Sequence, residues 1–295
     1  MRIALIANPR SGTAPEPARL RELLGGYGAA VSCVPIEEIA DEDSGELQDG
    51  ALAALRAAGA PDRLVVAGGD GSIGPAALCA ATLGVALAVL PVGTANDFAR
   101  AQGLPLDLDD ACALARDPGA ATRHAELGLA GARPFVNAAA AGLSVVAARA
   151  AKPHKSRLGP LAYAVGALRA GATAAPLRCA VSCDGDERFA GRAWQVVVGA
   201  TGAFGGGSEI GGTRADDAQL DVAVVPAGSR AGLVRRAYGM RAGSLTSQSD
   251  VAHERGGVID VRIDGAASFN VDGELCRCEP AHFALRPGGF EVVTG

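Results

Sequence analysis

Two short apolar runs, at residues 64–67 and 85–92, are separated by one alanine-rich segment of helical character. Each run ends abruptly in glycine and a small polar or acidic residue. Two parallel strands need a crossover of about a dozen residues or more, and this spacing provides one. The stretch therefore predicts a strand–helix–strand unit in a parallel sheet, with both polar turns at the same edge.

The same alternation extends through the first 122 residues. Strands are predicted at 2–8, 29–36, 63–68 and 85–93, and helices at 15–28, 44–59 and 72–84. Beyond residue 122, strand-like runs separated by Gly, Asp and Asn turns predominate, with helical segments at 158–171 and 229–243. We therefore expect a parallel α/β domain at 1–122 and an antiparallel β-sandwich domain at 123–295, whose last strand, 289–295, returns to either domain.

Charge and apolar patterning restrict the partners of the chain. A net charge of −5 argues against a general nucleic-acid-binding protein. Seven cysteines without disulfide spacing indicate reduced thiols in the cytoplasm. The N-terminal apolar run is too short for a signal peptide, and the longest apolar region falls short of the ~20 residues of a membrane span. Lys152, Lys155 and Arg157 precede an apolar helix, which leaves peripheral membrane contact or a solvated helix end as alternatives.

Three polar turns follow predicted strands, at residues 8–12, 68–72 and 93–97. Each alone is also compatible with an ordinary turn. Together, at the carboxyl edge of a parallel sheet, they predict a nucleotide site, because glycines admit phosphate oxygens and backbone N–H groups bind them. Asp70 suits a phosphate-bound Mg²⁺. The predicted nucleotide-binding residues are Asn8, Pro9, Arg10, Ser11, Gly12, Gly68, Gly69, Asp70, Gly71, Ser72, Gly93, Thr94 and Asn96.

The motifs "NPRSG", "GGDGS", "LPVGTANDFAR" and "NVDGE" resemble, in order and spacing, the blocks of the diacylglycerol kinase catalytic domain family. That family includes bacterial lipid kinases, sphingosine kinases and ceramide kinase. The resemblance spans nearly the whole chain, and "GTANDFAR" is its most specific part. It implies a nucleotide-binding α/β domain followed by a β-sandwich domain, with the active site in the cleft between them.

The resemblance also implies roles for single residues. ATP would lie on the three turns, with Asp70 in the Mg-ATP site and Asp97 binding the acceptor hydroxyl. Asp272 and Glu274 would act from the second domain, with Glu274 as general base and Asp272 as a supporting acid, although the reverse assignment stays open. A structural Mg²⁺ would be bound by Asp217 and by the carbonyls of two neighbours, Arg214 and Gln219.

Several positions depart from the family pattern. Gly74 and Pro75 replace the usual Asn and Glu after "GGDG", and the segment 34–36 lacks the expected threonine. Ala218 stands where glycine is usual, and Glu126 where aspartate is usual. These changes leave the phosphate-binding residues intact and affect the acceptor side.

Three functions remain open at this point. The first is an ATP-dependent kinase of a lipid alcohol such as diacylglycerol, acting at a membrane surface. The second is a kinase of the same fold that acts on a soluble or specialised-metabolite alcohol. The third is a regulatory protein that binds nucleotide without catalysis, which the presence of Asp70, Thr94, Asp97, Asp272 and Glu274 disfavours. A homodimer is left open.

Overall fold

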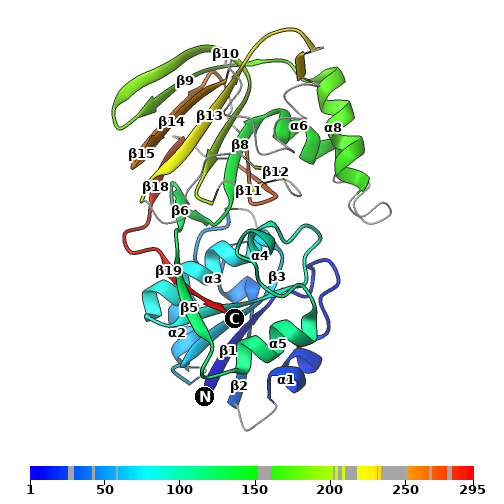
Figure 1. The fold of residues 1–295 in the computed structure, drawn as a ribbon, viewed down its shortest axis with the longest axis vertical. Helices are drawn as coiled ribbons and strands as arrows, with labels where there is room; N and C mark the ends of the chain where they lie inside the picture. Colours follow the sequence, from blue (N-terminus) through cyan, green and yellow to red (C-terminus); the bar gives the residue numbers. More distant parts are fainter. Residues whose placement is uncertain are drawn as a thin grey trace. The chain divides into compact units, whose positions relative to one another are not determined.

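The computed structural model describes two compact units (Figure 1). The first comprises Met1–Leu127, Ala132–Val136 and Pro287–Gly295, and the second Gly128–Gly131 and Asn137–Arg286. The described residues are 1–25, 30–41, 44–57, 59–151, 161–201, 203–204, 208–209, 218–230, 232–233, 251–265, 268–277 and 281–295. The basic residues Lys152, Lys155 and Arg157 lie outside them, as does most of the helix predicted at 229–243.

The first unit is built on a sheet with strand order β2-β1-β3-β4-β19-β5. All neighbours are parallel except β19 and β5. The strands are β1 (Arg2–Ala7), β2 (Ala30–Pro35), β3 (Arg63–Gly68), β4 (Ala86–Pro91), β5 (Ala121–Ala125) and β19 (Phe290–Thr294). The C-terminal strand β19, red in Figure 1, thus joins the sheet of the first unit.

Helices accompany this sheet, together with the short strand β7 (Arg133–Phe135). They are α1 (Pro17–Leu24), the 3₁₀ helix η2 (Ile36–Glu38), α2 (Ala51–Ala57), α3 (Asp70–Leu83), α4 (Asp97–Ala101) and α5 (Leu108–Arg116). Helix α2 is shorter than the predicted 44–59, because Gly45 has a φ of +69° and residues 40 and 47 form an isolated bridge.

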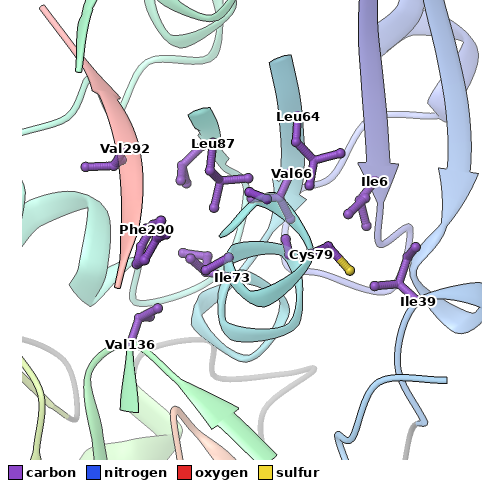
Figure 2. Close-up of a cluster of buried hydrophobic side chains, with 14 of the residues drawn as sticks. Ile6, Ile39, Leu64, Val66, Ile73, Cys79, Leu87, Val136, Phe290 and Val292 are labelled. Carbon is purple, nitrogen blue, oxygen red and sulfur yellow. The ribbon is translucent and has the colours of Figure 1, made fainter. Parts of the chain in front are cut away.

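Alternating side chains of the central strands form two cores, one on each face of the sheet. On one face, Ile6, Val66 and Leu87 pack with Ile73 of α3 and Phe290 of β19 (Figure 2). On the other face, Leu5, Val65 and Leu90 pack with α1 and α5. Burial on both faces explains why these strands are continuously apolar, as is typical of parallel sheets.

The second unit is an antiparallel sheet domain. Its order runs β17-β16-β8-β10-β9-β15-β18-β6, and β13 pairs with both β10 and β14. The strands are β6 (Gly128–Ala130), β8 (Ala138–Gly142), β9 (Leu177–Cys183), β10 (Asp186–Gly199), β13 (Leu220–Pro226), β14 (Ala252–Gly256), β15 (Val258–Ile263), β16 (Phe269–Val271), β17 (Glu274–Cys276) and β18 (Ala281–Leu285). A separate pair consists of β11 (Ala203–Phe204) and β12 (Ser208–Glu209).

Two helices, α6 (Leu143–Ala151) and α8 (Leu161–Thr173), pack against each other in this unit. A Cβ on Gly166 would stand 2.4 Å from the carbonyl oxygen of Ala147, so glycine permits this close approach. The guanidinium of Arg230 donates to the carbonyls of Gly171 and Ala174, at 2.7 and 2.8 Å, and lies 5.3 Å from the ring centroid of Trp194. Arg230 therefore joins the end of α8 to a tryptophan of β10.

Among the described residues, no helix is both long and apolar enough to span a membrane.

Candidate active site

The three predicted polar turns lie together at the carboxyl edge of the first sheet. They follow β1, β3 and β4, which are parallel neighbours. The amide of Asn8 donates to the carbonyl of Ala67 at 3.0 Å, and the amide of Thr13 donates to the carbonyl of Val92 at 3.0 Å. The turn after β1 is therefore hydrogen-bonded to the ends of both β3 and β4.

Two serine hydroxyls connect the first turn with the second. The side-chain amide of Asn8 donates to Ser72 Oγ at 2.9 Å, and the amide of Gly69 donates to Ser11 Oγ at 3.2 Å. A hydroxyl that accepts a hydrogen bond keeps its own proton for another acceptor. Ser11 is partly exposed, so its hydroxyl can donate to a bound ligand while it holds Gly69.

The carboxylate of Asp70 connects the second turn with the third. Its Oδ1 accepts the amide of Phe98 at 2.9 Å, and its Oδ2 accepts the amide of Asp97 at 3.2 Å. These amides belong to the first turn of α4, where an acidic group is favoured by the helix dipole. Asp70 thus holds α4 in place through both of its carboxylate oxygens.

Asn96 shapes the third turn from within. It has a left-handed backbone with a φ of +53°. Its Oδ1 accepts the amide of Gly93 at 2.9 Å, and its Nδ2 donates to the carbonyl of Pro91 at 2.9 Å. Thr94 is exposed at this turn, whereas Asp97 is only 7% exposed. Asn96 therefore organises the loop that presents Thr94.

Arg10 occupies the exposed side of the first turn. Its guanidinium donates to Glu37 Oε1 at 2.8 Å, and this hydrogen bond lowers the pKa of the Glu37 carboxyl. Both side chains are exposed, at 55% and 42%. Glu37 lies in η2 and was missed by sequence reasoning, because no motif points to it.

Gly74, one of the departures from the family pattern, has a packing explanation. A Cβ at this position would lie 2.6 Å from the carbonyl oxygen of Pro134 and 3.3 Å from the Cα of Phe135. Helix α3 therefore lies directly against the backbone of β7. Any larger residue at position 74 requires β7 to move.

The "NVDGE" motif forms a hairpin in the second unit. Asp272 and Gly273 connect β16 with β17, and their φ angles are +47° and +90°. Asp272 Oδ1 accepts the amides of Asn137 and Ala138, each at 3.0 Å. Glu274 follows on β17 with an exposed side chain. The carboxylates of Asp272 and Glu274 therefore have different surroundings.

The predicted structural metal loop falls mostly outside the described residues. Arg214 and Asp217 are not among them, and Gln219 is exposed immediately before β13. Within the described part of the chain, no cluster of three or more His, Cys, Asp or Glu side chains could hold a metal ion.

Family models match both halves of the chain. Residues 2–128 match the diacylglycerol kinase catalytic domain. Residues 137–294 match the YegS C-terminal NAD kinase beta sandwich-like domain. The fold and the motifs are thus those of a two-domain kinase that transfers phosphoryl groups.

Curated relatives agree with this assignment. A protein of Pseudomonas fluorescens named "Probable lipid kinase YegS-like" is 33% identical over 239 residues, which cover 78% of this chain and 76% of that protein. A diacylglycerol kinase of Bacillus subtilis is 26% identical over 226 residues, with coverage of 75% and 74%. The chain belongs to the diacylglycerol kinase catalytic domain family.

Solved structures share the fold. A diacylglycerol kinase from Bacillus anthracis str. Sterne has a TM-score of 0.74 at 21% identity, covering 100% of this chain and 97% of that one. An NAD kinase from Archaeoglobus fulgidus in complex with ATP has a TM-score of 0.50 at 13% identity, covering 100% and 94%. The architecture expected from the sequence, a parallel α/β unit and a separate antiparallel sheet domain, is confirmed.

Proposed function

We propose that this protein transfers a phosphoryl group from ATP to the hydroxyl of a lipid alcohol such as diacylglycerol. The observation that carries the proposal is the contact among three glycine-containing turns at one edge of a parallel sheet. Open α/β sheets bind ligands at this edge. The names of the relatives support a lipid as the acceptor.

The first turn of α3 fits a phosphate group. Gly69 occupies its N-cap position and makes no side-chain cap to the helix amides. The helix is 14 residues long, and its N-terminus carries partial positive charge. Ser11 and the exposed Thr94 add hydroxyl donors beside it. In our proposal these groups bind the phosphates of ATP.

Asp70 is the residue that we assign to the magnesium of Mg-ATP. Magnesium sites use one or two carboxylates together with phosphate oxygens and water, and the ion would neutralise charge on the phosphates during transfer. The carboxylate of Asp70 already accepts the amides of Asp97 and Phe98, which fixes its orientation. Asp97, the first residue of α4, is assigned to binding the acceptor hydroxyl.

Glu274 is the proposed general base. It would accept the proton of the acceptor hydroxyl as the oxygen attacks the phosphorus atom. Its carboxylate is exposed on β17 and follows the hairpin of Asp272 and Gly273. An exposed carboxylate on a hydrogen-bonded hairpin is accessible to substrate and limited in motion.

The test is phosphoryl transfer from radiolabelled ATP to diacylglycerol in mixed micelles, beside a panel of soluble alcohols. We expect lipid phosphorylation that requires Mg²⁺ and that falls roughly 10²–10⁴-fold in Glu274→Gln. Asp186→Asn is the matched control, because Asp186 follows the Asp184–Gly185 hairpin as Glu274 follows its own. It should leave turnover unchanged.

Three results would contradict the proposal in different ways. Transfer to a soluble alcohol with none to lipid would identify the same fold acting on a specialised metabolite. ATP binding without transfer to any acceptor would identify a regulatory nucleotide-binding protein. Unchanged turnover in Glu274→Gln would remove Glu274 from the mechanism.

A further inference from the structure

Two hairpins of the second unit have the same two-residue turn. Asp184 and Gly185 connect β9 with β10, and Asp272 and Gly273 connect β16 with β17. The φ angles are +50° and +88° in the first hairpin and +47° and +90° in the second. Positive φ at both central residues is the signature of a type I′ turn, for which Asp-Gly is a preferred sequence.

In the first hairpin the aspartate carboxylate replaces a main-chain acceptor. Two residues that form a hydrogen-bonded antiparallel pair normally exchange two backbone bonds. The amide of Asp184 donates to the carbonyl of Val258 at 2.9 Å, but the amide of Val258 donates to Asp184 Oδ1, also at 2.9 Å. The Asp184 side chain therefore extends the pairing of β9 with β15 by one residue pair beyond Cys183 and Ile259.

The second hairpin repeats this arrangement and extends it. The amide of Asp272 donates to the carbonyl of Ala138 at 3.0 Å, and the amide of Ala138 returns to Asp272 Oδ1 at 3.0 Å. The same oxygen also accepts the amide of Asn137 at 3.0 Å. Asp272 thus fastens the hairpin to the start of β8.

This attachment matters because β16 has little other pairing with β8. The register contains two residue pairs, Asn270 with Ala140 and Val271 with Ala139. Glu274 is paired with Val271 across the hairpin. The hydrogen bonds from Asp272 to Asn137 and Ala138 therefore add to these two residue pairs in holding the hairpin of Glu274 against β8.

We propose that Asp272 is a positioning residue, whose carboxylate acts as a main-chain acceptor that orients the hairpin carrying Glu274. The inference rests on the proposed function, in which Glu274 is the base, and it replaces the assignment of Asp272 as a supporting acid. The hairpin of Asp184 supports it, since the same clamp occurs there in a segment that matches none of the kinase motifs.

The proposal makes Asn an adequate substitute. Its amide oxygen accepts the same two N–H groups, and Asn tolerates positive φ well. Glycine at position 272 adopts the same positive φ but has no side-chain acceptor. Comparing Asp272→Asn with Asp272→Gly therefore distinguishes loss of the hydrogen bonds to Asn137 and Ala138 from a change in backbone strain. If the carboxylate of Asp272 transferred a proton or bound a metal ion, replacement by Asn would instead abolish most of the turnover.

The experiment compares Asp272→Asn and Asp272→Gly in the full-length protein, with Asp184→Asn and Asp184→Gly as controls. We measure kcat, KM and the pH profile of phosphoryl transfer, together with hydrogen exchange at the amides of Asn137, Ala138 and Val258. Asp272→Asn should keep kcat within about threefold and leave the pH profile and the exchange of Asn137 unchanged. Asp272→Gly should lower kcat by roughly 10–100-fold, because small misplacements of a catalytic group have effects of this size.

The controls locate the effect. Asp184→Gly should accelerate exchange at Val258 without changing kcat, and Asp184→Asn should change neither. A collapse of turnover in Asp272→Asn with protected Asn137 and Ala138 amides would overturn the proposal. So would unchanged exchange in Asp272→Gly, a readout that remains decisive if the protein transfers no phosphate. Failure of the proposed function would be recognised separately, because the wild-type protein would then transfer no phosphoryl group or Glu274→Gln would leave turnover unchanged.

Discussion

Gly93 lies so close to Gly69 that a Cβ on Gly93 would stand 2.4 Å from the Cα of Gly69. The second and third turns of the site are therefore in direct backbone contact. Gly93→Ala must push these turns apart. We expect a loss of roughly 1–3 kcal/mol in unfolding free energy and a marked loss of ATP affinity, measured by urea unfolding and calorimetric titration.

Gly50→Ala is the matched control for this variant. A Cβ on Gly50 meets no atom within 4 Å, and its φ is not in the left-handed region. Gly50 directly precedes α2, so the control should lose no more than about 1 kcal/mol, the usual size of an N-cap effect, and should keep the ATP affinity of the wild type. Equal ATP affinity in Gly93→Ala and in the control would show that the contact between the turns does not shape the nucleotide site.

Asp107 caps α5, and its removal should be measurable. Its Oδ1 accepts the amides of Asp109 and Asp110, at 2.9 and 3.1 Å. Asp107→Ala should cost about 1 kcal/mol of unfolding free energy, whereas Asp107→Asn should cost little because Asn is an equally good N-cap. Denaturant unfolding of the three proteins tests this, and a loss of the same size in both variants would exclude capping as the cause.

Buried cysteines should resist alkylation in the native protein. Burial raises the pKa of the Cys79 thiol to about 12 and those of Cys112 and Cys179 to about 11. A raised pKa keeps the thiol protonated, so at about pH 8 only roughly 10⁻³ or less of each is thiolate. Iodoacetamide labelling followed by peptide mass spectrometry should find these three unmodified until guanidinium chloride is added. Rapid labelling of Cys79 without denaturant would contradict this prediction.

Arg230 provides a spectroscopic test, because Trp194 is the single tryptophan of the chain. Arg230→Ala removes the cation above the indole ring and the donors to the last turn of α8. We expect red-shifted emission, stronger acrylamide quenching and a loss of about 1–3 kcal/mol in unfolding free energy. Arg192→Ala, an exposed arginine on the same strand as Trp194, should leave the emission unchanged.

The sequence was sufficient to predict the three turns of the site, because each follows an apolar strand and parallel strands end at one edge. It did not predict how the turns are held together. The bond from the Phe98 amide to Asp70 joins residues 28 positions apart, and Asn96 nearby has a left-handed backbone; a motif reveals neither feature. The bond from the Asn137 amide to Asp272 joins residues that are 135 positions apart, so no local pattern points to it.

Element boundaries were harder to predict where apolar patterns continue across a break. Beyond residue 122 the sequence predicts mainly strand-like runs, with no helix before residue 158, but the structure divides residues 133–151 into β7, β8 and the helix α6. Gly142, with a φ of +99°, ends β8. A Cβ added at this position would collide with the carbonyl of Trp194, a contact that becomes visible only after β8 is paired with β10.

Strand β19 has a consequence for biosynthesis. Residues 290–294 lie between β4 and β5 in the first sheet, yet they are translated after every strand of the second unit. During synthesis on a ribosome, the edges of β4 and β5 that later pair with β19 therefore stay unpaired until the last residues have been translated. Unpaired strand edges are prone to wrong association. We infer that the nucleotide-binding half matures last, and that a nascent chain interrupted before residue 290 yields a product open to chaperones and proteases.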